Sequence, residues 1–309
     1  MAIILISASQ DIAQWRESFA ALLPGVELRH WPDIGVADEI DMAIAWKAPE
    51  GALKSLPNLR LICSLGQGTD HLFRFDDLPP GVPITRLVDD SMRRQMTAYV
   101  IAAVTRRLCR MADYAALQAK GEWHPLTAYD PAAVVVGVLG LGALGRDVAE
   151  KLAGLGFELR GWSRNPAFIP GVECFNGKHS LAEMLGPCDM ICCLLALTSE
   201  TRGILDSRAY AAIKPGGYLI NSARGGHVVE ADLLAALDSG HLDGAALDVF
   251  EAEPLAADSP LWDHPKVELT PHISAVTMVQ SCAGQIAENY RRMTAGQPLL
   301  HVVDPDREY

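Results

Sequence analysis

The sequence predicts an α/β protein built from doubly wound parallel sheets, and three observations support this fold class. Short apolar runs alternate with helical stretches along most of the 309 residues, which is typical of parallel strands covered by helices. The valine-rich run 134–139 leads into glycines spaced G-x-G-x-x-G, which indicates a buried strand that turns tightly into a helix. Polar residues follow three of the later apolar runs, at the position where open α/β sheets bind their ligands.

The first part of the chain contains four predicted strands, at 3–6, 43–46, 61–64 and 83–87. The third of these leads into the loop 64–70, which contains Gly66 and Gly68. Two glycines in such a loop can leave several backbone amides pointing one way, which makes a cradle for a carboxylate or a phosphate. An ordinary turn explains the same residues equally well.

Residues 91–120 contain no proline or glycine, and Gly121 follows them. This pattern predicts one continuous helix that ends at the glycine. A helix of about 30 residues would be about 45 Å long. We therefore interpret this segment as a connector between two domains.

The glycines of the G-x-G-x-x-G run have separate predicted tasks. Gly140 permits the tight turn, Gly142 lets backbone amides approach a pyrophosphate, and Gly145 allows the helix to pack closely on the strand. The phosphates would lie at the helix N-terminus, where free N–H groups and the helix dipole favour negative charge. The predicted apolar face of this helix and the glycine that ends it are Val148, Leu152, Leu155 and Gly156.

The next predicted strand, 157–162, is followed by Ser163 and Arg164. A carboxylate at this place would accept a hydrogen bond from the ribose 2′-hydroxyl of NAD. A serine hydroxyl and a guanidinium instead suit a 2′-phosphate, which a carboxylate would repel. We therefore expect NADPH as the cofactor and NADH as a weaker one. A solvent-exposed loop arginine is the alternative interpretation.

The second part of the chain contains four further predicted strands, at 190–197, 218–221, 245–249 and 267–269. This part then has six predicted strands in all, the number expected of a doubly wound dinucleotide fold. Loops after three of them carry Arg224, Glu253 and His272. Arg224 can grip a carboxylate and polarise the adjacent carbonyl. His272 can pass a proton to a carbonyl oxygen as hydride arrives on carbon, and Glu253 can orient the imidazole and favour its protonated form.

Each of these side chains also has a purely structural explanation. Arg224 could clamp a phosphate, Glu253 could cap a helix, and His272 could be a packed loop histidine. Their common position after successive strands favours a joint functional site. Among the other histidines, His71 is a weaker candidate for the proton donor, and we expect His227 to face solvent rather than bind substrate.

The composition is that of a globular protein, with 50% hydrophobic and 21% charged residues. A formal net charge of -12 argues against nucleic acid or an anionic membrane as a partner, because both need a basic face. A nucleotide cofactor and an oxoacid substrate are also anionic. They must therefore be bound by local positive groups.

Seven cysteines show no C-x-x-C spacing, and we predict no metal site. Cys192 and Cys193 lie in an apolar run and are predicted to be buried in a strand. Reduced thiols and a cytoplasmic location are the expectation. We interpret residues 1–7 as a first strand rather than a signal peptide, and no apolar run approaches the length that spans a membrane.

Several motifs together resemble the D-isomer-specific 2-hydroxyacid dehydrogenases. They are the glycine turn, the loop Leu195-Ala196-Leu197-Thr198-Ser199-Glu200-Thr201, the runs 221–225 and 248–254, and Thr270-Pro271-His272. The resemblance covers nearly the whole chain and is most specific from Gly140 onward. Trp162-Ser163-Arg164, the run 227–240 and the C-terminal residues 303–309 are most similar to the glyoxylate/hydroxypyruvate reductase A group of that family.

The resemblance implies a split architecture, in which a Rossmann cofactor domain, 91–275, is inserted into a flavodoxin-like substrate-binding domain, 1–90 and 276–309. It implies that Arg224 binds the substrate carboxylate and carbonyl, that Glu253 supports His272, and that His272 is the acid/base. Trp46 would limit substrate size, and family members are usually homodimers. The backbone amides implied to hold the substrate carboxylate are those of Leu65, Gly66, Gln67 and Gly68.

The resemblance also implies cofactor contacts on the glycine turn and on the loops that follow later strands. Ala196 stands where a proline is common in the family, and Gln67 stands where members vary, so the fine shape of the pocket is left open. The implied cofactor-binding residues are Gly140, Gly142, Ala143, Leu144, Gly145, Ser163, Arg164, Leu195, Ala196, Leu197, Thr201, Ser222, Ala223, Arg224, Asp248, His272 and Ser274.

The expected activity is NADPH-dependent reduction of small 2-oxoacids, glyoxylate to glycolate and hydroxypyruvate to D-glycerate. One alternative is a dehydrogenase of a larger D-2-hydroxyacid. A second alternative, from another class, is a non-catalytic nucleotide-sensing module, which would not need Arg224, Glu253 and His272 together.

Overall fold

The computed structural model describes residues 1–75 and 77–305. Residue 76 and residues 306–309, the end of the C-terminal segment compared with the family, lie outside the described residues. The chain divides into two compact units, one formed by Met1–Met92 with Val276–Tyr309 and the other by Arg93–Ala275. The second unit is therefore inserted into the sequence of the first.

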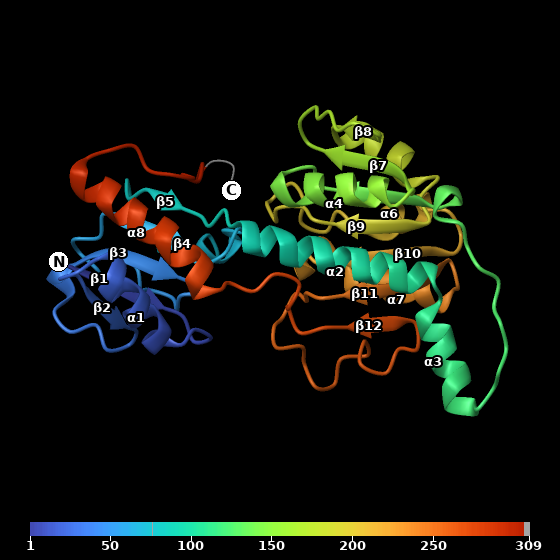
Figure 1. Ribbon diagram of the computed structural model, residues 1–309, viewed down its shortest axis with the longest axis horizontal. Coiled ribbons are helices and arrows are strands. Elements are labelled where there is room, and N and C mark those ends of the chain that lie inside the picture. Colours follow the sequence, from blue (N-terminus) through green and yellow to red (C-terminus); the bar gives the residue numbers. More distant parts are fainter. Residues whose placement is uncertain (76, 306–309) are drawn as a thin grey trace. The chain divides into compact units, whose positions relative to one another are not determined.

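The first unit is built on a five-stranded parallel sheet with the order β2-β1-β3-β4-β5 (Figure 1), which is the flavodoxin-like order. Alternate residues of β1, Ile4 and Ile6, pack in one apolar cluster with Ala43 and Ile62 of the neighbouring strands. Helices α1 and α8 pack against each other. The elements are β1 (Ala2–Ile6), α1 (Ile12–Leu22), β2 (Glu27–His30), β3 (Ile40–Ala45), β4 (Leu61–Ser64), β5 (Ile84–Thr85) and α8 (Val279–Ala295).

Two strands of this unit differ from the prediction. The edge strand β2 was not predicted, because it is short and mostly polar, and Arg29 is buried there through ion pairs with Glu27 and Glu39. The predicted strand 83–87 is reduced to Ile84–Thr85.

The second unit is built on a seven-stranded parallel sheet with the order β12-β11-β10-β9-β6-β7-β8. The chain runs from β6 outward to β8 and then returns to β9 on the other side of β6. The strand order thus reverses between β6 and β9, the position at which doubly wound sheets bind dinucleotides. The strands are β6 (Val135–Leu139), β7 (Glu158–Ser163), β8 (Val172–Asn176), β9 (Met190–Cys193), β10 (Gly217–Asn221), β11 (Leu242–Leu247) and β12 (Val267–Leu269).

The observed strand orders confirm the predicted fold class, but the count of six strands in the second sheet is wrong. The additional strand, β8, lies at the sheet edge and contains only intermediate and exposed residues. Its partly polar sequence gave no strand signal, because an edge strand need not be apolar on both faces. The helices are α2 (Asp90–Leu108), α3 (Met111–Lys120), α4 (Ala143–Gly154), α5 (Leu181–Leu185), α6 (Ser207–Ala212) and α7 (Glu230–Asp238).

The predicted continuous helix 91–120 is interrupted and forms α2 and α3. Arg110 adopts the left-handed conformation, with φ 56° and ψ 36°, and its guanidinium donates to Asp113 at 2.7 Å. Because an arginine rarely adopts this conformation, the sequence contains no signal for the break. The predicted stop at Gly121 is confirmed by its φ of 68°.

The glycine turn leads into α4, whose buried face contains Val148 and Leu152, as predicted. Leu155 does not belong to that face, because the helix ends at Gly154 and the Leu155 side chain is 48% exposed. Gly156 follows with a φ of 95°, which ends the helix where the sequence predicted.

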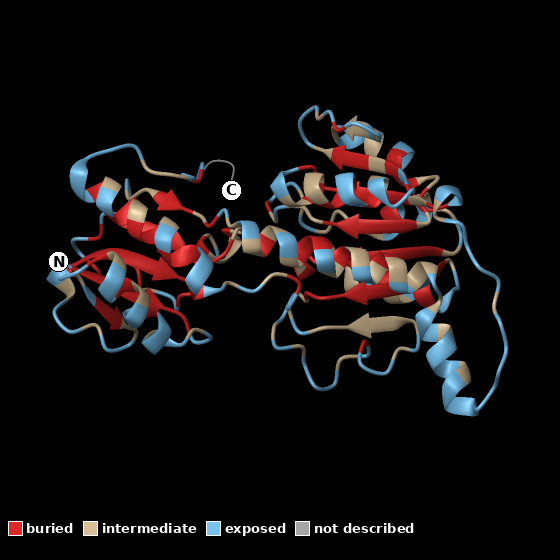
Figure 2. Ribbon diagram, viewed as in Figure 1, coloured by how far each residue is buried: buried red, intermediate tan, exposed pale blue. Residues whose placement is uncertain are grey.

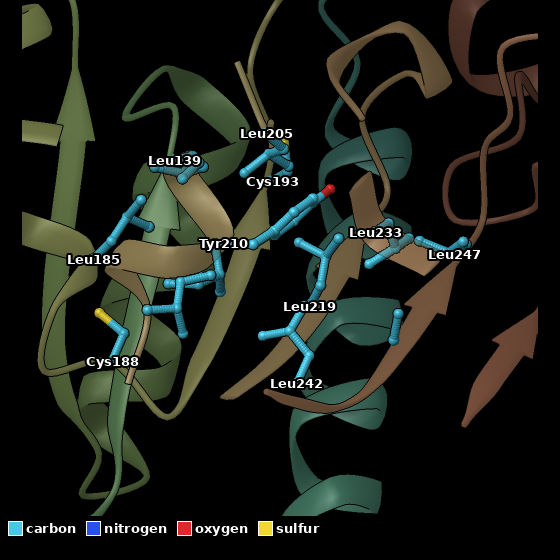
Figure 3. Packing of buried hydrophobic residues seen from close by; sticks show 14 of the residues in the cluster. Leu139, Leu185, Cys188, Cys193, Leu205, Tyr210, Leu219, Leu233, Leu242 and Leu247 are labelled. Atoms are coloured by element: carbon cyan, nitrogen blue, oxygen red, sulfur yellow. The ribbon is translucent and has the colours of Figure 1, made fainter. Parts of the chain in front are cut away.

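The second sheet is buried on both faces, which explains its continuous apolar strands. In β9, Ile191 and Cys193 pack on one face with Tyr210 and Leu219 (Figure 3), and Cys192 packs on the opposite face. Burial raises the pKa of the Cys193 thiol to about 12, so the thiol stays protonated. The predicted burial of both cysteines is confirmed, and the central strands of this sheet are buried (Figure 2). Among the described residues, no helix is long and apolar enough to cross a membrane.

Candidate active site

The glycine turn after β6 has the geometry that the sequence predicted. Gly140 has a φ of 101°, and a Cβ there would lie 2.7 Å from the Leu194 carbonyl oxygen. A Cβ on Gly145 would lie 1.7 Å from the Gly140 carbonyl oxygen, so only glycine lets α4 start this close to the strand. A Cβ on Gly142, by contrast, would meet no atom within 4 Å. The space above Gly142, at the N-terminus of α4, is therefore open.

Ser163 and Arg164 lie at the carboxyl end of β7, beside this turn in the sheet. The Ser163 hydroxyl donates to the Asn165 carbonyl at 2.6 Å, which fixes the turn that carries Arg164. The Arg164 guanidinium forms an ion pair with Glu200, with Nη1 and Oε2 3.1 Å apart. Glu200 belongs to the segment after β9, and the sequence gave no reason to connect it with Arg164.

Hydroxyl groups of the implied cofactor residues have different environments. The Thr201 hydroxyl donates to the Ala196 carbonyl at 2.7 Å and accepts from the Thr198 amide at 2.9 Å, so it shapes the turn after β9. The Ser222 hydroxyl, at the end of β10, is buried and has no hydrogen-bond partner within the described part of the chain. A polar ligand at this edge of the sheet could satisfy it.

These residues fit a dinucleotide. The open space at Gly142, the amides at the start of α4 and the reversal of strand order at the same edge are the features that accept a pyrophosphate. Within residues 1–75 and 77–305 no group of three or more His, Cys, Asp and Glu side chains is arranged to hold a metal ion.

The second unit also carries an imidazole–carboxylate pair. His272 Nδ1 lies 2.8 Å from Glu253 Oε2, and the other carboxylate oxygen of Glu253 accepts from the Phe250 amide at 3.1 Å. The side chains of His272 and Glu253 are 25% and 18% exposed. Because Glu253 engages Nδ1, Nε2 is the ring nitrogen that can exchange a proton with a ligand.

Arg224 lies on a loop that packs backbone to backbone against the loop of Glu253. A Cβ on Gly225 would lie 1.9 Å from the Phe250 carbonyl carbon, so glycine is required for this contact. The Arg224 guanidinium donates to the Ala223 carbonyl at 2.7 Å. The Asn221 side chain holds the same turn, with its amide donating to the Arg224 carbonyl at 3.0 Å.

Asp248 organises the loop of His272, a role that the sequence did not reveal. Its buried carboxylate accepts from the Thr270 hydroxyl at 2.6 Å and from the amides of Ile273 and Ser274 at 2.8 Å each. The His272 amide donates to the Asp248 carbonyl at 2.8 Å, and His272 has a φ of 56°. Asp248 and Ser274, expected to contact a cofactor, therefore hold the loop in this conformation.

Tyr99 of α2 extends this network. Its hydroxyl lies 2.7 Å from the Thr270 hydroxyl. Burial, reinforced by the charges of Asp248 and Glu268, raises the pKa of Tyr99, so the phenol stays protonated. Neither Tyr99 nor Thr270 was predicted to support the site, because an ordinary buried tyrosine and a loop threonine give no distinguishing signal in a sequence.

The glycine loop of the first unit, 64–71, forms its own hydrogen-bond network. The Leu65 amide donates to the Ala45 carbonyl at 3.0 Å, and the Gly66 amide donates to the Ser64 hydroxyl at 3.2 Å. The amides of Gln67 and Gly68 make no hydrogen bond among the described residues. Of the four amides expected to bind the substrate carboxylate, those of Leu65 and Gly66 therefore have partners within the first unit.

Trp46 packs over this loop. A Cβ on Gly66 would lie 2.5 Å from the Trp46 ring, and the Trp46 and His71 rings are 4.6 Å apart between centroids. His71 Nδ1 accepts from the Lys47 amide at 3.3 Å, and Nε2 lies 3.0 Å from the Ser64 hydroxyl. Both nitrogens of His71, the weaker candidate for the proton donor, are thereby engaged within the first unit.

His227 also differs from the prediction. It is fully buried rather than exposed to solvent, and its Nδ1 donates to the Arg224 carbonyl at 3.1 Å. His227 ends the short 3₁₀ turn Gly225–His227, which begins directly after Arg224. Its contribution is to hold that loop.

A doubly wound sheet with a glycine turn at its switch point, and an imidazole–carboxylate pair after later strands of the same sheet, define a dinucleotide-dependent dehydrogenase. The comparisons with known proteins agree. The NAD binding domain of the D-isomer specific 2-hydroxyacid dehydrogenases matches residues 99–274. The chain belongs to this family, and the resemblance drawn from the sequence motifs is confirmed.

Relatives and solved structures match over the whole length. Glyoxylate/hydroxypyruvate reductase A of Serratia proteamaculans is 40% identical over 98% of both chains. A D-isomer specific 2-hydroxyacid dehydrogenase from Xanthobacter autotrophicus, solved with NADPH and MES, is 41% identical with a TM-score of 0.94, covering 100% of this chain and 99% of that one. The NADPH-dependent glyoxylate/hydroxypyruvate reductase of Sinorhizobium meliloti, solved with NADP and sulfate, is 36% identical with a TM-score of 0.93 and 100% coverage of both chains.

Alanine substitutions at two glycines should separate cofactor binding from packing. Gly142→Ala places a methyl group in open space, so we expect the free energy of unfolding to change by less than about 0.5 kcal/mol. The affinity for the dinucleotide should fall about tenfold or more, because the methyl group occupies the space assigned to the pyrophosphate. Gly145→Ala places a methyl group against the Gly140 carbonyl, so the free energy of unfolding should fall by about 1–3 kcal/mol or more. Calorimetry and nucleotide fluorescence titration measure both effects, and equal loss of stability in the two variants would contradict the assigned roles.

Proposed function

We propose that this protein is an NADPH-dependent reductase of small 2-oxoacids, which converts glyoxylate to glycolate and hydroxypyruvate to D-glycerate. The observation that carries the proposal is the contact between His272 and Glu253, 2.8 Å apart, on the unit that holds the dinucleotide-binding turn. The names of full-length relatives at 40% identity support the reaction. A module that only senses nucleotides would not need this pair.

The chemistry is hydride transfer coupled to proton transfer. Bound NADPH supplies hydride to C2 of the 2-oxoacid and leaves as NADP⁺. His272 gives a proton from Nε2 to the carbonyl oxygen, which becomes the hydroxyl of the product. Arg224 binds the substrate carboxylate and carbonyl oxygen and stabilises the negative charge that develops on that oxygen.

Glu253 is a positioning residue in this scheme. One of its oxygens holds Nδ1 of His272, and the other is held by the Phe250 amide. This arrangement fixes the ring orientation, so that Nε2 is the nitrogen that gives the proton. The rigid backbone contact at Gly225 keeps the Arg224 loop beside the Glu253 loop.

The first unit supplies the substrate specificity. We assign the substrate carboxylate to the amides of Gln67 and Gly68, since those of Leu65 and Gly66 are engaged within the loop. The Trp46 indole, which is packed on Gly66, limits the size of the 2-oxoacid side chain. Residues 1–92 and 276–309 thus act as the substrate-binding domain, and residues 93–275 act as the cofactor domain.

The preference for NADPH is assigned to Arg164 and Ser163 at the end of β7. A guanidinium there can bind a 2′-phosphate, whereas NAD would call for a carboxylate. Structures of relatives with NADPH or NADP bound support this choice. We place the reaction in the cytoplasm, because all seven cysteines are free thiols, which suits a reducing compartment.

The proposal is tested by following oxidation of NADPH and NADH with glyoxylate, hydroxypyruvate and phenylpyruvate. We expect turnover with both small substrates, at least about tenfold higher kcat/KM with NADPH than with NADH, and little activity with phenylpyruvate. Tight NADPH binding without turnover would favour the sensing module. Preference for phenylpyruvate would favour the dehydrogenase of larger substrates.

The assigned roles of His272 and Glu253 predict the pH profile and the effect of a substitution. Reductive turnover should fall as pH rises through the range in which imidazole loses its proton, because the neutral ring then carries no proton on Nε2 to give to the substrate. In Glu253→Gln the carboxylate that orients the ring through Nδ1 is lost, so kcat at neutral pH should fall about tenfold or more. Glu251→Gln, which removes an exposed carboxylate paired with Arg202, is the control. A profile that stays flat into alkaline pH would remove His272 from this role.

We further propose that the protein is a homodimer. Helix α3 has no buried residue (Figure 2), and its first residue, Met111, is about half exposed. The segment after the helix carries Trp123, which is fully exposed, and Tyr129, which is about half exposed. The Leu126 amide donates to the Tyr114 hydroxyl at 3.0 Å, so this segment is hydrogen-bonded to α3. An apolar surface of this kind is typical of a subunit interface, and a second copy of the chain is the partner we assign to it.

The dimer is tested by sedimentation equilibrium of the wild type and of Trp123→Glu. We expect the wild type to have twice the chain mass of 33.3 kDa, and Trp123→Glu to weaken the dimer by about 2 kcal/mol or more, which is a more than tenfold rise in Kd. Phe168→Glu, which alters another exposed aromatic residue, is the matched control. A wild type of single-chain mass would refute the dimer, and a fully dimeric Trp123→Glu would refute the interface.

A further inference from the structure

The ion pair between Arg164 and Glu200 joins two segments that flank the dinucleotide-binding turn. Arg164 follows β7, and Glu200 belongs to the segment that follows β9. In the sheet, β6 lies between these two strands. The pair, with Nη1 and Oε2 3.1 Å apart, therefore crosses the carboxyl end of β6, where the glycine turn begins.

Both ends of this pair are held by well-defined turns. Thr198 and Thr201 exchange hydrogen bonds, from the Thr198 amide to the Thr201 hydroxyl at 2.9 Å and from the Thr201 amide to the Thr198 carbonyl at 3.1 Å. These bonds close the turn that contains Glu200. On the other side, the Ser163 hydroxyl bond to Asn165 closes the turn that contains Arg164. The contact is thus set by the backbone of both segments.

We propose that Glu200 is a specificity-determining residue, which acts as an internal anion that competes with the cofactor 2′-phosphate for Arg164. This inference rests on the proposed use of NADPH. The Glu200 carboxylate and a phosphate are both anions that bind guanidinium through charge-assisted hydrogen bonds. A phosphate that approaches Arg164 must therefore replace the carboxylate or share the guanidinium with it.

The competition affects the two cofactors differently. NADH carries no 2′-phosphate, so Arg164 keeps Glu200 as its counter-ion and no cation is left without a partner. NADPH brings a second anion next to the Glu200 carboxylate, and the repulsion between them lowers its affinity. The side chains of Arg164 and Glu200 are 39% and 47% exposed, and ion pairs this exposed are weak. The phosphate can therefore still displace Glu200, and Glu200 reduces the preference for NADPH without abolishing it.

The neighbouring strand supplies one more positive group near this site. The Gly177 amide, after β8, donates to the Ser163 carbonyl at 3.3 Å, and Trp162 donates from its indole to the Gly177 carbonyl at 2.9 Å. Lys178 follows directly in the chain. A positive charge at this place would act alike on the carboxylate of Glu200 and on a phosphate, so it would not distinguish the two anions. Glu200 is therefore the residue whose removal changes the selectivity.

The experiment measures binding of 2′,5′-ADP, ADP, NADPH and NADH to the full chain by calorimetry. Glu200→Gln should tighten the two ligands that carry a 2′-phosphate by about 3- to 10-fold, with the other two unchanged within about twofold. The gain should shrink as ionic strength rises. Glu173→Gln is the matched control, since it removes an exposed carboxylate that is paired with Arg160 at 2.7 Å on β8, and it should change none of the four affinities.

A double-mutant cycle isolates the route through Arg164. In the Arg164→Gln background, Glu200→Gln should give a smaller gain for the 2′-phosphate ligands, because the cation for which the anions compete is absent. An equal gain in both backgrounds, an equal effect on all four ligands, or weaker NADPH binding in Glu200→Gln would overturn the inference.

The wild-type affinities separate this inference from the proposed function. If the wild type does not prefer 2′,5′-ADP to ADP, the proposed NADPH preference fails and this inference fails with it. If the wild type has that preference and Glu200→Gln leaves it unchanged, only the role of Glu200 is refuted.

Discussion

The geometry of the loop that carries His272 depends on the buried carboxylate of Asp248. A buried carboxylate is costly unless donors satisfy it, and here the donors come from the Thr270 hydroxyl and the amides of Ile273 and Ser274. Those bonds hold His272 at a φ of 56°, a conformation that a non-glycine residue adopts only when its surroundings impose it. The loop supplies the hydrogen bonds that the buried carboxylate needs, and the same hydrogen bonds fix the conformation of the loop. The His272–Glu253 contact, and with it the direction in which the imidazole presents Nε2, follows from this mutual dependence.

Local charge pairs reconcile an acidic protein with anionic ligands. The chain has a formal net charge of -12, so a phosphate or an oxoacid is not attracted by the molecule as a whole. Basic side chains at the carboxyl edge of the second sheet are matched with carboxylates, as Arg164 is with Glu200 and His272 is with Glu253. The two pairs have different consequences in the proposed scheme. The Glu253 carboxylate orients the proton donor, whereas the Glu200 carboxylate competes with the cofactor 2′-phosphate for Arg164.

The sequence predicted the features that local chemistry determines, and it did not predict those that depend on distant contacts. The glycine turn was predictable because each glycine answers a steric demand that is visible in its spacing, and Gly145 against Gly140 shows that demand directly. Arg224, Glu253 and His272 were singled out because parallel strands bring their carboxyl ends to one edge. The break at Arg110 was missed because a left-handed arginine has no sequence signature. The amide of Leu65 and the side chain of Glu200 have partners that are remote in sequence, so their roles emerged only from the structure.

The glycine turn, Arg224 and His272 all follow strands of one sheet, and this placement matters for hydride and proton transfer. Hydride and proton have to reach adjacent atoms of the substrate, so their sources need a fixed separation. A sheet buried on both faces holds the ends of its strands rigidly, and the contacts at Gly225 and Asp248 extend that rigidity into the loops. The second unit therefore fixes the positions of the glycine turn, Arg224 and His272 relative to one another. In the proposed scheme the choice of 2-oxoacid belongs to Trp46 and the 64–71 loop, so substrate range and proton transfer are separable properties of this fold.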